Sequence, residues 1–178
     1  GKGCNLYALG WKFSGAAQVI LRYLRMGYLW DSVRVKGGAY GVSCRLGRST
    51  GNFVCTSYRD PNVSGTISAY DGIADYLSGM SLNREELERA IVGAIGDLDL
   101  YMLPDARGVK SLYQSIAGAT AEKCQRMREE MLYTTADDYR AFDGSMAEAK
   151  THGAVSVIGG SRALEEGTRL GWKCENLF

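Results

Sequence analysis

An arginine and a tyrosine stand close together at the junction between a predicted helical turn and a predicted strand. Arg34 closes the turn and Tyr40 precedes the strand, with Gly37-Gly38 between them. An arginine guanidinium donates hydrogen bonds in a fixed fork, and a tyrosine hydroxyl can donate to an oxyanion that develops during a reaction. On one continuous helix the two side chains would point to nearly opposite sides. Because a helix end and two glycines separate them, they can converge.

A purely structural interpretation of these residues stays open at this point. Asp31 lies three positions before Arg34, so the two side chains could form an ion pair on one helix. Tyr40 could equally be a buried tyrosine of the strand. The polar group Ser57–Asp60 presents the same choice, because a pair between its arginine and its aspartate would simply hold a turn.

Other kinds of chemistry find little support in the sequence. The chain has one histidine, His152, so neither H-E-x-x-H nor H-x-x-E-H can occur, and we predict no metal site in this chain. No serine lies in a G-x-S-x-G motif, which argues against a Ser-His-Asp hydrolase. Gly159-Gly160 before Ser161 could bind an anion, but a plain turn between a strand and a helix explains the glycines as well.

Residues 27–58 must form the elements that position Arg34 and Tyr40. An apolar helical turn opens this stretch and Gly37-Gly38 ends it. The apolar residues Val42, Cys44 and Leu46 then alternate with polar ones, which predicts a strand with one buried face. Gly51-Asn52 predicts a turn and Phe53–Tyr58 the return strand of a hairpin.

The rest of the chain predicts mostly amphipathic helices between short strands at the two ends. This order favours one α+β domain over residues 1–178, with a mainly antiparallel sheet that contains the hairpin and packs against several helices. The predicted elements are a strand at 5–13, a helix capped by Ser14, helices from about 63 and after the capping box at 83–86, a loop at 100–108, helices at 108–117 and 120–132, a helix capped at 135–138, a strand at 154–158, a helix at 161–167 and a strand-length tail at 172–178.

Composition narrows the class of protein. Hydrophobic residues make up 46% of the 178 residues and charged residues 23%, which is typical of a globular protein. The formal net charge of +1 argues against a nucleic-acid binder, and no apolar run is long enough for a membrane span. The cysteines are odd in number and form no C-x-x-C pair, so we expect thiols in a reducing compartment.

Four segments together resemble a known family. They read L-x-x-G-Y-L-W-D-x-V-R-V-x-G-G-A-Y-G, S-Y-R-D-P-N, Y-D-G-I-A-D-Y-L and A-I-V-G-A-I-G-D-L-D-x-Y-x-L-P-D-A-R-G, in this order. Their motifs and order are similar to the C-terminal domain of the presequence protease, or falcilysin-like, branch of the pitrilysin-type zinc metallopeptidases. The resemblance runs from about Asn5 to Met146, and the last thirty residues match more loosely.

The resemblance implies a role for the chain in peptide hydrolysis. In this family the N-terminal half holds zinc through H-x-x-E-H, and the C-terminal half supplies an arginine and a tyrosine that match Arg34 and Tyr40. The implied roles are to hold the main chain of the peptide substrate (Arg34) and to donate to the tetrahedral oxyanion (Tyr40). The implied substrates are targeting peptides and other short unstructured peptides, and the implied partner is the N-terminal catalytic half.

The resemblance also sets limits on what this chain can do alone. Zinc would be bound by the missing half and not by this chain, so we expect the chain alone to be inactive. The family's last domain has more strand before Asn5, so we expect a piece of a longer protein or a separately encoded half. The family's habit implies a mitochondrial or plastid-like organelle, which these residues do not themselves encode. Two alternatives remain, a non-catalytic interaction subunit and, less supported, a small-molecule enzyme that uses Gly159-Gly160.

Overall fold

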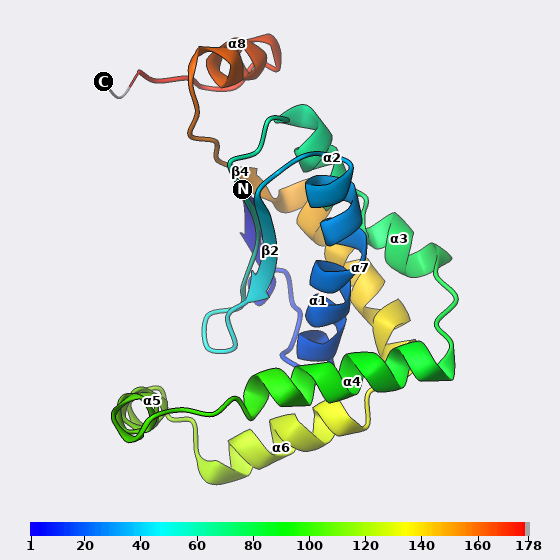
Figure 1. Ribbon diagram of the computed structural model, residues 1–178, viewed down its shortest axis with the longest axis vertical. Helices are drawn as coiled ribbons and strands as arrows, with labels where there is room; N and C mark the ends of the chain where they lie inside the picture. The colour runs from blue at the N-terminus through cyan, green and yellow to red at the C-terminus, as the bar shows by residue number, and fades with distance from the viewer. Residues whose placement is uncertain (177–178) are drawn as a thin grey trace.

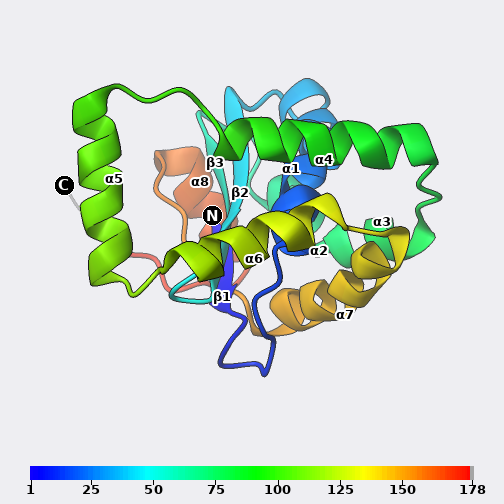
Figure 2. The same cartoon turned by 90° about the horizontal axis from the view of Figure 1, so that it is seen from below.

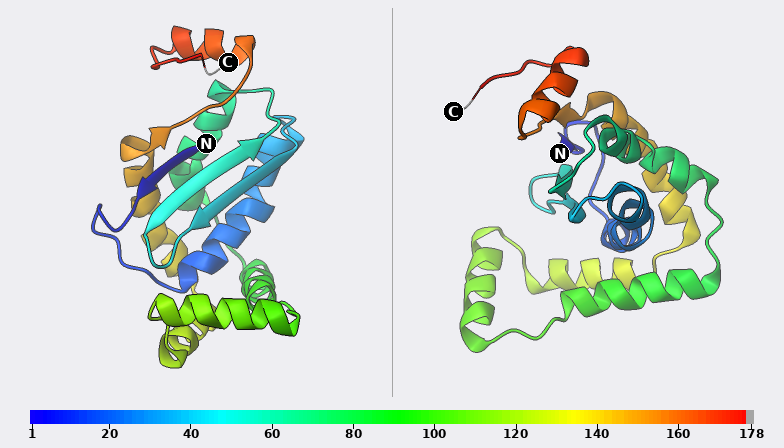
Figure 3. Two further views of the ribbon diagram at one scale, coloured as in Figure 1. Left: turned by 90° about the vertical axis from the view of Figure 1, so that its left-hand side faces the viewer. Right: turned by 45° about the horizontal axis from the view of Figure 1, so that its top comes forward.

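A four-stranded antiparallel sheet forms the centre of the protein. The computed structural model describes residues 1–176. The strands are β1 (Lys2–Asn5), β2 (Gly41–Leu46), β3 (Asn52–Tyr58) and β4 (Ala154–Val155), and they lie in the order β2-β3-β1-β4. The first and the last strand of the chain are therefore neighbours in the sheet, and the hairpin β2-β3 extends it on the other side (Figure 3). This arrangement confirms the predicted α+β class and the predicted hairpin.

The hairpin register follows from the alternation of its residues. Cys44 lies opposite Cys55, and Leu46 lies opposite Phe53. All four side chains are buried on one face of the sheet, while Arg45 and Val54 between them are exposed on the other. Because side chains of a strand alternate between the two faces, the apolar positions of both strands reach the same core.

Eight α-helices and one short π-helix are the helical elements of the described residues (Figure 1). Helices α1, α2 and α7 cover one face of the sheet, α3 packs against α7, and no helix of the described part lies across the other face (Figure 3). Helices α4 and α6 pack together against α1, while α5 projects from the body (Figure 2). The bounds are α1 (Ala16–Met26), η1 (Trp30–Val35), α2 (Ser64–Asp71), α3 (Ile73–Gly79), α4 (Arg84–Leu98), α5 (Pro104–Ile116), α6 (Ala121–Leu132), α7 (Ala136–His152) and α8 (Ser161–Arg169).

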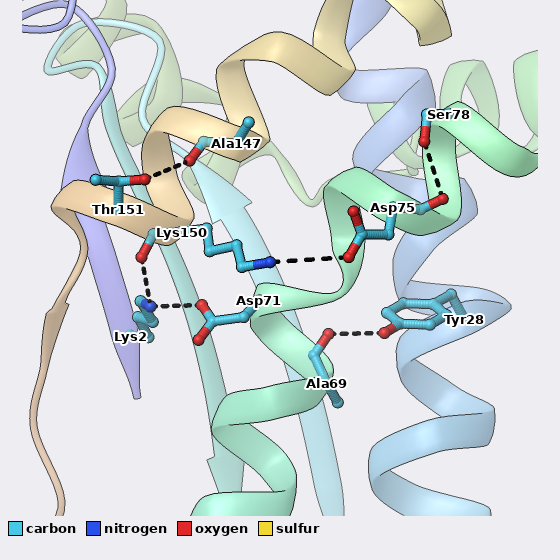
Figure 4. Close-up of polar contacts among 9 residues, drawn as sticks. All are labelled: Lys2, Tyr28, Ala69, Asp71, Asp75, Ser78, Ala147, Lys150 and Thr151. Carbon is cyan, nitrogen blue, oxygen red and sulfur yellow. Dashed lines mark hydrogen bonds and ion pairs between the residues drawn. The ribbon is translucent and has the colours of Figure 1, made fainter.

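Polar contacts tie the sheet to two of these helices (Figure 4). The Lys2 ammonium on β1 pairs with the Asp71 carboxylate at the end of α2 and donates to the Lys150 carbonyl on α7 at 2.8 Å. The Lys150 ammonium in turn lies 3.8 Å from the Asp75 carboxylate on α3. These contacts thus link β1 to α2 and to α7, and link α7 to α3.

Several predicted elements have the bounds that local signals indicated. Asn83 and Glu86 form the capping box of α4, and Thr135 and Asp138 form that of α7. The inward residues of α7, Tyr139, Phe142 and Met146, are 1%, 3% and 3% exposed. No helix among the described residues is both long and apolar enough to cross a membrane.

Other predicted elements are wrong. Residues 6–10 form turns in place of a strand, because Gly10 takes a left-handed φ of 87° and the Leu9 and Trp11 amides both return to the Leu6 carbonyl. The predicted loop at 100–108 ends early, since Pro104 occupies the first turn of α5, where its missing N–H costs nothing. The strand at 154–158 shortens to Ala154–Val155. No strand forms at 172–176, and 177–178 lie outside the described residues.

Candidate functional site

Arg34 lies on a π-helix. In η1 the Lys36 amide donates to the Asp31 carbonyl, five residues back, at 2.9 Å. Val33 is 1% exposed and anchors the turn in the core, whereas the neighbouring Arg34 is only partly buried. Gly38 then takes φ 78°, and the amides of Gly38 and Ala39 return to the carbonyls of Arg34 and Val33. A left-handed glycine of this kind ends a helix and redirects the chain into the next strand.

The backbone of Tyr40 connects this turn to the hairpin. Its amide donates to the Tyr58 carbonyl at 3.1 Å and to the Arg59 carbonyl at 3.3 Å. Its carbonyl accepts a hydrogen bond from the Nε of Arg34 at 3.1 Å. Both backbone polar groups of Tyr40 are therefore engaged, while the residue stays 67% exposed.

The Arg34 side chain lies against an indole ring. Its guanidinium carbon is 3.9 Å from the centre of the Trp30 ring, a cation–π contact between positions four apart on η1. The proposed ion pair between Asp31 and Arg34 is wrong for residues 1–176, because stacking on Trp30 and bonding to Tyr40 take the guanidinium elsewhere. The alternative of a buried Tyr40 is wrong as well.

Tyr58, the last residue of β3, and Arg59, which follows it, complete a surface cluster that we define as Arg34, Tyr40, Tyr58 and Arg59. The Tyr40 and Tyr58 rings meet edge to face, with centres 6.1 Å apart and an interplanar angle of 80°. The Arg59 guanidinium carbon lies 5.9 Å from the Tyr40 ring centre and 5.5 Å from that of Tyr58. The cluster presents two guanidiniums and two phenols at one edge of the domain.

Helix α2 and the turn before it form hydrogen bonds with the segment that carries Arg34 and Tyr40. The Tyr28 hydroxyl, just before η1, donates to the Ala69 carbonyl of α2 at 2.9 Å (Figure 4). The Asn62 side-chain amide donates to the Gly37 carbonyl. A side chain at Gly72 would start 2.5 Å from the Tyr28 hydroxyl, so any other residue there would displace this hydroxyl. These contacts fix the segment from Tyr28 to Tyr40, which we call the corner, to the core.

The carboxylate of Asp60 does not pair with its neighbour Arg59. It accepts from the main-chain amide of Asn62 at 2.9 Å and from the Thr66 hydroxyl at 2.7 Å, which ties the turn after β3 to α2. The Arg–Asp pair expected in Ser57–Asp60 is therefore wrong, because the arginine turns toward the aromatic rings instead.

Buried hydroxyls below the cluster are unsuited to acid–base work. Tyr70 is 6% exposed, burial raises its pKa to about 12, and its hydroxyl has no hydrogen-bond partner in the described structure. Burial also raises the pKa of Tyr28. Both phenols stay neutral at any physiological pH and serve as structural groups.

A groove of about 940 Å³ adjoins the cluster. Tyr58 and Arg59 line one end, Ile67 and Tyr70 lie on the α2 side, and Gly159-Gly160 before α8 lies on the other side. The structure thus places the predicted glycine turn on a groove wall, and whether it binds an anion stays a prediction.

The described residues do not fit a zinc site. Nowhere in residues 1–176 do three His, Cys, Asp or Glu side chains come together in a group that could hold a metal ion. His152 lies on the last turn of α7, 3.4 Å from the Glu148 carboxylate. The cysteines of the described part are free thiols, of which Cys44 and Cys55 are buried and Cys174 is exposed.

The structure brings Arg34 and Tyr40 into contact at the surface, and their roles remain a prediction. Sequence reasoning missed Trp30 as the partner of Arg34, although a spacing of four residues on a helix was a usable signal. It also missed that Tyr58 and Arg59 join Tyr40. No local signal could have shown this, because the contact depends on how the hairpin meets the π-helix.

Comparisons with known proteins match this domain to one family. The model of the PreP C-terminal domain matches residues 1–161. The chain is 40% identical over 165 residues to "Presequence protease 1, chloroplastic/mitochondrial" of Arabidopsis thaliana, which is 93% of this chain and 15% of that protein. It is 32% identical to "Protein HypA" of Clostridium perfringens, over 95% of this chain and 17% of that protein.

A fungal protein extends the comparison. Over 71% of the chain, the sequence is 35% identical to "Presequence protease, mitochondrial" of Aspergillus oryzae, which amounts to 12% of that protein. The chain thus spans less than a fifth of the length of each of these three relatives. With the family model covering nine-tenths of its residues, the chain belongs to the PreP C-terminal domain family of presequence-protease-like proteins.

Proposed function

We propose that the chain completes the active site of a zinc metallopeptidase that degrades targeting peptides and other short unstructured peptides. The observation that carries this proposal is the surface cluster, in which Arg34 and Tyr40 are fixed through the Tyr40 backbone while the phenol stays exposed. A peptide hydrolase needs donors that hold the substrate main chain and stabilise the oxyanion, and these two side chains can supply them.

Each residue has a distinct task in this proposal. The Arg34 Nε is engaged by the Tyr40 carbonyl, whereas its terminal nitrogens make no hydrogen bond with the described residues and can donate to peptide carbonyls. The Tyr40 hydroxyl donates to the oxygen that becomes negative in the tetrahedral intermediate. Such a donor stabilises the transition state more than the bound peptide, so it raises turnover.

The metal belongs to another part of the protein in this proposal. Because residues 1–176 offer no ligand set, we assign zinc, which would polarise the scissile carbonyl and activate water, to the N-terminal catalytic half. Hydrolysis by the isolated chain is not expected. The names of the plant and fungal relatives support a mitochondrial or plastid-like location, while the Clostridium relative shows that the domain also occurs in a bacterium.

The proposal is tested in the full-length enzyme with a short peptide substrate. Tyr40→Phe removes one oxyanion donor, so kcat should fall by about 10²–10³. Arg34→Ala should raise KM, because it removes contacts to the bound main chain. Tyr133→Phe, at a tyrosine that is 79% exposed and outside the cluster, is the matched control and should leave both constants unchanged.

The same experiment examines the alternative of a non-catalytic interaction subunit. If the domain were only a scaffold, Tyr40→Phe and Arg34→Ala would leave hydrolysis unchanged while the two halves still associated. Chelator-resistant hydrolysis by the isolated chain would contradict the division of the active site between two halves.

A further inference from the structure

Arg59 has an unusual backbone conformation. Its φ of 48° makes it the one non-glycine residue with a positive φ among residues 1–176. An L side chain is disfavoured there, so the conformation persists where surrounding contacts impose it, and such residues cluster at functional sites. The disfavoured backbone conformation therefore directs attention to the contacts that the Arg59 side chain makes.

Contacts on both sides impose this conformation. The Arg59 carbonyl accepts a hydrogen bond from the Tyr40 amide at 3.3 Å. The next residue, Asp60, is held by its own bonds to the Asn62 amide and the Thr66 hydroxyl. The turn from β3 to α2 thus fixes Arg59 from before and after, and it directs the side chain back over the hairpin.

The side chain meets aromatic rings and no carboxylate. Its guanidinium carbon lies within 6 Å of the ring centres of Tyr40 and Tyr58, and no carboxylate in residues 1–176 lies within salt-bridge distance of it. Tyr58 also meets Tyr40 edge to face. The exposed Tyr40 ring therefore has contacts that limit its rotation.

We propose that Arg59 is a positioning residue that holds the Tyr40 phenol in its working orientation, an inference that rests on the proposed function. An exposed tyrosine without side-chain neighbours samples several rotamers, and a donor is effective only when it already points to the site of the developing charge. Arg59 acts through the ring of Tyr40 and does not itself touch the substrate. Tyr58 supports the same ring from its edge.

A double-mutant cycle in the full-length enzyme tests this role. Arg59→Gly removes the guanidinium and suits the left-handed backbone, so the protein should fold, which thermal unfolding checks. We expect kcat to fall about tenfold, as for a displaced catalytic group, with KM unchanged. Arg59→Lys, which keeps a cation near the rings, should recover part of this loss. In a Tyr40→Phe background, Arg59→Gly should have no further effect on kcat.

Each result decides between defined outcomes. Equal losses from Arg59→Gly with and without the Tyr40 hydroxyl would overturn the positioning role, as would an unchanged kcat for Arg59→Gly alone. If either of these two results is found while Tyr40→Phe alone still lowers kcat, the proposed function survives and only the positioning role of Arg59 fails. Unchanged turnover in Tyr40→Phe itself would overturn both. Arg89→Gln, on the exposed surface of α4, is the control arginine and should not change kcat.

Discussion

Two exposed tyrosines show how differently this domain presents its surface. Tyr40 is 67% exposed and Tyr113, on α5, is 68% exposed. The backbone N–H and C=O of Tyr40 are both bonded to residues of other segments, and its ring contacts Tyr58 and Arg59. Helix α5 has no buried residue at all in the described structure. The two tyrosines are therefore equally exposed, but only Tyr40 has the rigid support that the proposed role would require.

The largest expected difference between the corner and α5 lies in how much one leucine of each region contributes to the free energy of unfolding. Leu29, immediately before η1, is fully buried, and Leu112 on α5 is 59% exposed. Leu29→Ala should lower the free energy of unfolding by about 2–5 kcal/mol through lost burial and a cavity, and Leu112→Ala by less than about 0.5 kcal/mol. Urea unfolding of the two variants measures both. Equal effects would mean that α5 packs more tightly than its exposure indicates.

A second expected effect concerns the free energy of unfolding in alkaline solution. Cys44 lies on the buried face of β2, and its thiol donates to the Leu21 carbonyl of α1 at 3.3 Å. Burial raises its pKa to about 12 from an ordinary value of 9.0. The unfolded thiol loses its proton first as pH rises, so the free energy of unfolding should fall between pH 9 and 12 by about 1.4 kcal/mol per pH unit.

Cys44→Ala isolates this contribution to the pH dependence. The variant should be less stable at neutral pH but should lose less stability than the wild type between pH 9 and 11. Urea unfolding at several pH values measures the two slopes. The same slope in both proteins would show that other groups, such as the buried Cys55, cause the alkaline loss.

The smallest expected effects concern glycines and have opposite signs. Gly38 takes a φ of 78°, so Gly38→Ala should destabilise the domain by about 1–2 kcal/mol. Gly108 lies within α5 with open space where a side chain would start, so Gly108→Ala should stabilise that helix by about 0.5–1 kcal/mol. Thermal unfolding compares the two. Stabilisation by Gly38→Ala would mean that the corner is less constrained than its hydrogen bonds indicate.

Local signals in the sequence were sufficient for part of this fold. The capping boxes at Asn83 and Thr135 and the alternation in the hairpin depend on residues a few positions apart, and the structure confirms them. The strand predicted at 5–13 failed where Gly10 turns the chain. The contact of Arg59 with Tyr40 joins segments that meet only through tertiary packing, so no short-range pattern could reveal it.

The π-helical turn has a consequence for sequence change in this domain. A π-helix holds about one residue more per turn than an α-helix, so removing one residue from Trp30–Val35 would restore ordinary winding. Every later side chain on the turn would then rotate by about 100° around the axis. A protein with that deletion could keep every chemical group of the motif and still direct its guanidinium away from the phenol. Insertions and deletions here should therefore matter more than conservative substitutions.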